Sequence, residues 1–157
     1  MSLELWFDGA CEPRNPGGVA TCGWVIELRG ETIDEGYRVV STGSSATNNL
    51  AEYSALGLAL RSLIASDIVN QERIESLNIY GDSKLVVEQV SGRWQCKQTS
   101  TQRLRDRCLE LLEKLGIEWQ ATWIPREENE RADALSQRAY VEFTGKPFPR
   151  RVKNGAR

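Results

Sequence analysis

The chain has 157 residues, of which 40% are hydrophobic and 27% are charged, and its formal net charge is -2. This length suits one domain with a buried core, and the charge excludes a protein that attracts nucleic acid through its overall charge. The sequence contains no histidine, which excludes Ser-His-Asp and Cys-His nucleophilic catalysis.

The predicted elements follow an order typical of α/β proteins. Alternating or short apolar runs bounded by turn residues predict strands at 3–8, 19–28, 32–40, 76–81 and 117–124. Helical periodicity and capping signals predict helices at 47–65, 83–90, 101–115 and 127–141. Three antiparallel strands followed by helices alternating with two further strands indicate a mixed sheet in one α/β domain, residues 1–142.

Residues 143–157 hold five basic residues and no acidic one, which predicts a basic, flexible tail that adds phosphate contacts. The four cysteines, Cys11, Cys22, Cys96 and Cys108, lack CxxC spacing, so we expect reduced thiols in a cytoplasm and no zinc site. No apolar run approaches the roughly 20 residues of a membrane span, and no signal peptide is recognisable.

Four acidic residues stand in separate segments of the sequence. Asp8 and Asp82 end predicted strands, whereas Glu52 and Asp133 lie within predicted helices. Each one alone has an ordinary explanation. Asp8 precedes Gly9 as in a turn, Glu52 stands near a capping-box position, Asp82 could cap a helix, and Asp133 could be solvated on a helix surface.

Two observations favour a shared site over those four separate explanations. Glu52 lies on one helix stripe with Leu56 and Leu63, so its carboxylate turns toward the core and needs a partner or a metal ion. Asp8 and Asp82 follow strands at the carboxyl edge of the sheet, where open α/β sheets place their ligands. Four converging carboxylates would bind divalent cations for phosphodiester cleavage.

The segments around these acids resemble the type 1 ribonuclease H family. The resemblance covers about residues 3–139 and is carried, in the family's order, by FDGACEPRNPGG, TNNLAEYSAL, IYGDSKLVV and NERADALSQRA. It implies the RNase H-like fold, a mixed five-stranded sheet in the order 3-2-1-4-5 flanked by helices. It also implies that Asp8, Glu52, Asp82 and Asp133 are catalytic and bind two Mg²⁺ or Mn²⁺ ions.

By that resemblance the chain is an endoribonuclease that hydrolyses the RNA strand of RNA–DNA hybrids to 5′-phosphate and 3′-hydroxyl ends. One ion would activate the attacking water, and the other would stabilise the leaving 3′ oxygen. Double-stranded RNA stays open as a second substrate. Met1 directly precedes the first strand, so we expect a stand-alone protein rather than the terminal domain of a reverse transcriptase. We also expect a monomer.

Five further residues match substrate-binding positions of the family. Asn15, Asn48 and Asn49 are expected at the minor groove, where amides can bind the 2′-hydroxyl that distinguishes RNA from DNA. Thr47 is expected at a DNA phosphate, although helix capping explains Thr47 and the two neighbouring asparagines equally well. Lys84 stands where some relatives have glutamine, and we expect it to reach a phosphate.

The sequence departs from the family in two places. The loop before Asp133 lacks the histidine found in many members, and Arg126 is the nearest candidate to bind phosphate and assist product release. The basic clamp insertion of some relatives is also missing, since only SGRWQCKQTS separates two predicted helices. Trp94 in that segment is expected to pack in the core or at an edge.

Two other functions compete with this interpretation. A binding module for hybrids that no longer cleaves would not need four intact acids. A different nuclease on the same fold would not need the Thr-Asn-Asn and Asn-Pro-Gly-Gly segments, which match the hybrid-specific branch.

Overall fold

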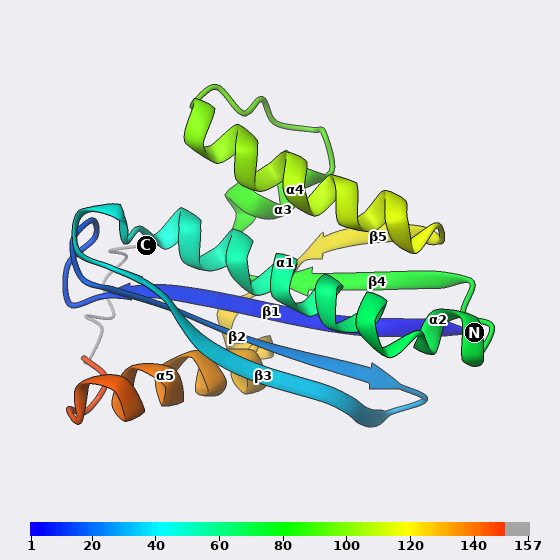
Figure 1. Ribbon diagram of the computed structural model, residues 1–157, viewed down its shortest axis with the longest axis horizontal. Coiled ribbons are helices and arrows are strands. Elements are labelled where there is room, and N and C mark those ends of the chain that lie inside the picture. Colours follow the sequence, from blue (N-terminus) through cyan, green and yellow to red (C-terminus); the bar gives the residue numbers. More distant parts are fainter. Residues whose placement is uncertain (150–157) are drawn as a thin grey trace.

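A computed structural model describes residues 1–149 of the chain, and its centre is one five-stranded sheet (Figure 1). The strands are β1 (Ser2–Glu12), β2 (Val19–Leu28), β3 (Glu31–Thr42), β4 (Ser76–Gly81) and β5 (Glu118–Trp123). Their order in the sheet is β3-β2-β1-β4-β5; β1–β2 and β2–β3 are antiparallel, whereas β1–β4 and β4–β5 are parallel. The predicted fold class and strand order are confirmed.

Helices cover both faces of this sheet (Figure 1). The longer ones are α1 (Asn48–Ser66), α4 (Thr99–Leu115) and α5 (Glu130–Thr144), and the shorter ones are α2 (Ile68–Gln71), α3 (Lys84–Val90) and the 3-10 turns Gly43–Ser45 and Arg126–Glu128. The main core lies between the sheet and the α1, α3 and α4 side, where Phe7, Leu56, Ile79 and Val86 are fully buried. Helix α5 packs against the other face.

The first strand is longer than the sequence pattern predicts. The pattern stops at Asp8, because the following Asp-Gly pair and prolines are typical of a loop. In the structure β1 continues to Glu12, because its pairing with β2 runs on from Asp8↔Gly23 to Glu12↔Val19. The interpretation of Asp8 as a turn residue is therefore wrong, and Asp8 lies in the middle of a strand.

The carboxyl end also differs from the prediction. Helix α5 continues to Thr144, beyond the expected domain boundary at residue 142, and the ring of Phe148 packs edge-on against Tyr140 at 5.4 Å. The basic residues Arg150, Arg151, Lys153 and Arg157 of the expected tail lie outside the described residues. Within residues 1–149 no helix has the length and apolar character needed to cross a membrane, and all four cysteines are free and buried.

Candidate active site

Asp8 and Asp82 meet where two parallel strands stop pairing. The β1–β4 register ends at Phe7↔Gly81, so the next residue on each strand is one of these two acids. Helix α3 starts immediately afterwards, and its N-cap is Ser83, whose hydroxyl accepts a hydrogen bond from the Val86 amide at 3.3 Å. Asp82 is therefore not the helix cap.

A glycine lets α1 approach β1 and brings Glu52 to Asp8. A Cβ atom added to Gly9 would stand 2.4 Å from the carbonyl carbon of Ala51 and 2.5 Å from the amide nitrogen of Glu52. No residue with a side chain fits at that distance, so the helix backbone rests directly on the strand. Thr47 caps α1 by accepting from the Leu50 amide at 3.0 Å, which excludes a capping-box role for Glu52.

A second glycine does the same for α5 on the opposite face of the sheet. Gly23 pairs with Asp8 across the strands, and a Cβ atom there would lie 2.5 Å from the carbonyl oxygen of Ala132. The contact between β2 and α5 is fixed by a buried 2.9 Å hydrogen bond between the Thr21 and Ser136 hydroxyls. This close packing carries the first turn of α5, and Asp133 with it, to the side of Asp8.

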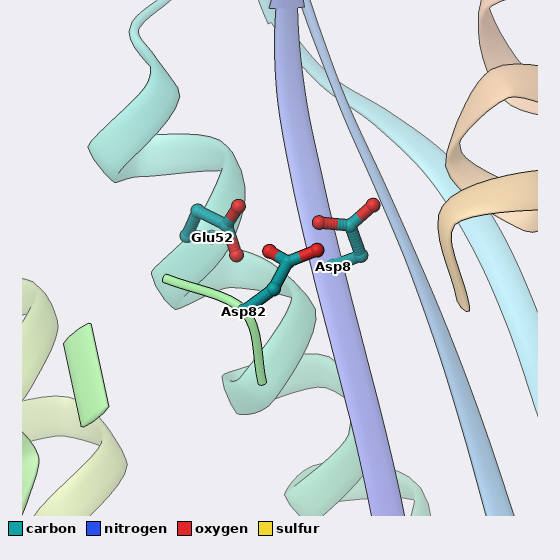
Figure 2. Close-up of side chains that lie close together, drawn as sticks. All are labelled: Asp8, Glu52 and Asp82. Atoms are coloured by element: carbon teal, nitrogen blue, oxygen red, sulfur yellow. The ribbon is translucent and has the colours of Figure 1, made fainter. Parts of the chain in front are cut away.

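Three carboxylates converge at this point (Figure 2). One oxygen from each of Asp8, Glu52 and Asp82 lies within 4.8 Å of the other two. Asp8 is only 3% exposed. Burial, followed by the negative charges of Glu52, Asp82 and Asp133, raises the pKa of the Asp8 carboxyl well above its ordinary value. The protein holds together negative charges that repel one another, and a bound cation would relieve that repulsion.

Asp133 completes the set from the α5 side. Its Oδ2 atom accepts a hydrogen bond from the side-chain amide of Gln137 at 3.0 Å and lies 3.6 Å from Nη2 of Arg126. Asp133 is half-buried and contributes to the raised pKa of Asp8. It is therefore not a solvated residue on the helix surface. Because Arg126 is 33% exposed, one side of its guanidinium remains open to solvent.

The donor set fits a hard divalent cation. The clustered oxygens of Asp8, Glu52 and Asp82 are the ligand type that Mg²⁺ and Mn²⁺ prefer, and water and substrate phosphate usually fill the remaining positions of such an ion. The thiol of Cys22 is buried close enough to Glu52 and Asp8 to be affected by their charges, and burial raises its pKa to about 12. Cys22 thus stays protonated and does not compete as a soft ligand.

Asn129 is a site residue that sequence reasoning missed. It is 1% exposed, and its side-chain amide donates to the carbonyl of Phe7, the residue before Asp8, at 2.9 Å. The backbone carbonyl of Asn129 accepts from the Asp133 backbone amide at 3.1 Å. One residue thus ties the strand of one acid, through its side chain, to the helix of another, through its backbone. The only sequence signal for Asn129 is its place at the start of the NERAD segment, because a single buried asparagine produces no periodic pattern.

The four candidate residues for the minor groove and the phosphate gather at the start of α1. The Asn15 side chain accepts from the Asn48 backbone amide at 3.0 Å and holds the β1–β2 loop against α1. The Asn48 side chain accepts from the Cys11 backbone amide at 3.0 Å and holds the end of β1 against α1. Thr47 is the helix cap. Among the described residues, the Asn49 side chain makes no hydrogen bond, so both its donor and its acceptor remain available.

Lys84 lies beside the acids, over an aromatic ring that the sequence pattern did not single out. Its ammonium is 5.9 Å from the ring centre of Trp123, whose indole N–H donates to the Asp82 carbonyl at 3.2 Å. Trp123 is 45% exposed, so this pair forms a cationic and aromatic surface next to Asp82. Trp94 is 44% exposed, so of its two expected places, the core or an edge, the core is wrong. No helix lies between α3 and α4, in agreement with the expected absence of the clamp.

Comparisons with known proteins agree with this fold. A family profile described as "Reverse transcriptase-like" matches residues 6–139. The crystal structure of RNase H1 from the halophilic archaeon Halobacterium salinarum superposes with a TM-score of 0.76 at 36% identity, covering 90% of this chain and 99% of that one. The chain belongs to the ribonuclease H1 family.

Two other ribonuclease H1 proteins extend the comparison. LC11-RNase H1, solved in complex with an RNA/DNA hybrid, superposes with a TM-score of 0.75 at 28% identity and covers 90% of this chain and 98% of that one. The curated ribonuclease HI of Halobacterium salinarum is 39% identical over 138 residues, which are 87% of this chain. The match spans only 63% of that relative, so this chain corresponds to part of its length.

Proposed function

We propose that this chain is a metal-dependent endoribonuclease that hydrolyses the RNA strand of RNA–DNA hybrids to 5′-phosphate and 3′-hydroxyl ends. The observation that carries the proposal is the cluster of Asp8, Glu52 and Asp82 in a ribonuclease H1 fold. A binding module would gain nothing from three carboxylates that repel one another beside a buried strand. Their cost is understandable if they bind cations for catalysis.

Asp8, Glu52, Asp82 and Asp133 would hold the metal, with Asp8 in the centre. Mg²⁺ or Mn²⁺ bound there supplies Lewis-acid activation of water and charge stabilisation at the leaving oxygen. The protein contributes the rigid placement of the carboxylates, because Gly9 and Gly23 fix the helices that carry two of them. Arg126 beside Asp133 would bind a non-bridging phosphate oxygen.

The RNA–DNA hybrid is the substrate we propose. A hybrid is the ligand of LC11-RNase H1, which shares the fold. In this chain Asn15, Asn48, Asn49 and Thr47 form a polar surface next to Glu52, with amides that can donate to or accept from a 2′-hydroxyl. Lys84 and Trp123 provide a cation and an exposed ring on the other side of Asp82. We also propose a monomer, and a cytoplasmic location, for which the four free cysteines are support.

A panel of substrates tests the proposal. The full chain is incubated in Mg²⁺ or Mn²⁺ with one labelled RNA sequence, presented as an RNA–DNA hybrid, as double-stranded RNA and as single-stranded RNA. The same sequence as a DNA duplex serves as the control. We expect internal cuts in the RNA of the hybrid, with 5′-phosphate ends. Equal cleavage of double-stranded RNA would extend the substrate class to that duplex. Cleavage of the DNA duplex alone would contradict the proposed ribonuclease activity.

Replacing Asn49 tests the choice of the RNA strand. In Asn49→Ala we expect the ratio of hybrid to DNA-duplex binding to fall by about fivefold, because one amide contact to a 2′-hydroxyl is worth about 1 kcal/mol. The fold should be unchanged, since the Asn49 side chain bonds to none of the described residues. Equal ratios for the variant and the wild type would remove Asn49 from substrate recognition.

Replacing Arg126 tests the substitute for the missing histidine. We expect Arg126→Ala to lower the single-turnover cleavage rate by roughly tenfold, or about 1.4 kcal/mol in the barrier. Arg126→Lys should recover part of that loss, because lysine keeps the charge but not the planar fork. Metal binding, measured as the rise in melting temperature with Mg²⁺, should persist in both variants. An unchanged rate in Arg126→Ala would show that the arginine pairs with Asp133 but has no part in cleavage.

A further inference from the structure

The outer surface of α1 forms the floor of a groove that the proposed cleavage reaction does not use. The groove has a volume of about 460 Å³ and runs between the edge strand β3 and helix α4. Ser54, Gly57, Leu58 and Arg61 of α1 line it. At about 100° per residue these positions face away from Glu52, which points into the protein from the same helix. The groove therefore lies on the side of α1 that faces away from the clustered acids.

The groove combines an apolar floor with positive charge. Val40, Leu58 and Leu104 are partly exposed in it and pack on the main core beneath. Its charged lining residues are three exposed arginines from three different elements: Arg38 of β3, Arg61 of α1 and Arg107 of α4. No acidic residue lines the groove, although the whole chain carries a net charge of -2.

These arginines have little charge compensation within the protein. Arg38 and Arg61 form no ion pair with any of the described residues, and Arg107 is paired only with the exposed Glu110, at 3.6 Å. Three uncompensated or weakly paired guanidinium groups around an apolar floor favour a ligand that has carboxylates and a bulky apolar group. A nucleic acid fits less well, because the lining aromatic residue, Tyr53, is 1% exposed and offers no ring for stacking.

Gly57 is a second, independent indication that the groove is kept open. Glycine is a poor residue for the interior of a helix, and here neither backbone geometry nor packing requires it. A Cβ atom at Gly57 would meet only the sulfur of Cys108, at 3.8 Å, which is ordinary contact. This contrasts with Gly9 and Gly23, where neighbouring backbone excludes any side chain. What the missing side chain provides at position 57 is depth in the groove.

We propose that this groove, lined by α1, β3 and α4, is a docking site for an acidic segment of a partner protein. The segment would place a bulky apolar side chain over Gly57 and Leu58. Its carboxylates would pair with Arg38, Arg61 and Arg107. This mode follows the general rule for short peptides, in which an apolar anchor supplies affinity and flanking charges supply specificity. The proposal does not depend on cleavage activity.

Selection from a peptide library tests this inference. Random dodecapeptides displayed on phage are selected on the immobilised wild-type chain in EDTA and counter-selected on the variant Gly57→Met, whose side chain fills the groove. We expect the enriched sequences to combine Asp or Glu with Phe, Trp, Leu or Ile. No enrichment, or enrichment of basic sequences, would overturn the proposal.

Binding of the most enriched peptide, made synthetically with a fluorescein label, locates the site. We expect Gly57→Met to weaken it at least tenfold, Arg61→Ala about fivefold, and the double variant Arg38→Ala/Arg61→Ala roughly twentyfold. Arg138→Ala, which removes an exposed charge from α5 on the other face of the sheet, is the matched control and should bind as the wild type does. Equal binding by all variants would place the peptide elsewhere and overturn the proposal.

Two controls separate lost peptide binding from lost folding and from lost hybrid binding. Gly57→Met should raise the melting temperature by roughly 2–4 °C, because methionine is the better helix former, so lost binding cannot be lost folding. Hybrid binding and cleavage by Gly57→Met and Arg61→Ala should match the wild type. If these variants instead weaken hybrid binding as much as peptide binding, the groove is a nucleic-acid surface and the proposed partner is wrong.

Discussion

Asp8→Asn is expected to lower hybrid cleavage by at least about 10³-fold and, in the absence of metal, to make the protein more stable at pH 7. Activity falls because the central ligand loses its negative charge. Stability rises because Asp8 is buried among Glu52, Asp82 and Asp133, and its pKa is raised above the ordinary 3.8. Each pKa unit corresponds to about 1.4 kcal/mol, and each kcal/mol to about 2–4 °C in melting temperature.

The pH dependence of this stability difference follows from the sign of the shift. A carboxyl group whose pKa is raised by folding favours the folded state most at low pH, and that contribution is lost as the pH rises through the raised pKa. The advantage of Asp8→Asn should therefore shrink as the pH falls toward about 4. Melting curves in EDTA between pH 4 and 8 measure it. A variant that is less stable than the wild type at pH 7 would mean that the carboxylates do not repel one another.

Metal should reverse the order of stability. Mg²⁺ at saturating concentration stabilises only the chain that binds it, by an amount that grows with the ratio of metal concentration to dissociation constant. The wild type should therefore gain stability with Mg²⁺, and Asp8→Asn should gain much less. A matched rise in both proteins would place the metal elsewhere.

Gly9→Ala is expected to destabilise the protein by about 3 kcal/mol and to lower cleavage at least 100-fold. The new methyl group would stand 2.4 Å from the backbone of α1, whereas ordinary contacts begin at 3.4 Å. Helix α1 would have to move by about 1 Å, and Glu52 would move with it away from Asp8. The loss of activity should exceed the loss of folded protein. Chemical denaturation measures the folded fraction, and the cleavage assay measures the activity.

Gly57→Ala is the matched control for that substitution. Gly57 lies on α1, the helix that Gly9 contacts, and a methyl group there would meet only the Cys108 sulfur, at 3.8 Å. It should raise stability by about 1 kcal/mol through helix propensity and leave cleavage unchanged. If Gly9→Ala behaved like Gly57→Ala, the close contact between β1 and α1 would not be what positions Glu52.

Much of the fold could be predicted from the sequence because its signals are local. Alternation at Leu3, Leu5 and Phe7 predicts the first strand, and the helical stripe of Glu52, Leu56 and Leu63 predicts the first helix. The short turn between β2 and β3 predicts an antiparallel hairpin, whereas β4 and β5 are separated by helices, as parallel strands are. The predicted end of the first strand was wrong because it depends on pairing with a strand elsewhere in the chain. The carboxyl part of β1, 9–12, contains Gly9 and reads as a loop, yet it pairs with β2 along its whole length.

The candidate acids were identified from the sequence, but their surroundings were not. A resemblance of four short segments indicates which carboxylates belong together, whereas only the structure shows that Gly9 and Gly23 bring the helices close enough. Asn129 and Trp123 escaped notice because their roles depend on partners 122 and 41 residues away in the sequence. The groove over α1 has no sequence signature, since its arginines come from three separate elements.

The most direct test of the central claim is cleavage of an end-labelled RNA–DNA hybrid by the wild type and by Asp82→Asn, with Mg²⁺, with Mn²⁺ and with EDTA. We expect internal cuts in the RNA strand that require metal and that this one substitution abolishes, while hybrid binding persists. Cutting in EDTA, or undiminished cutting by Asp82→Asn, would contradict a metal site built from these carboxylates. Hybrid binding by the wild type without cleavage in either metal would contradict the enzyme itself.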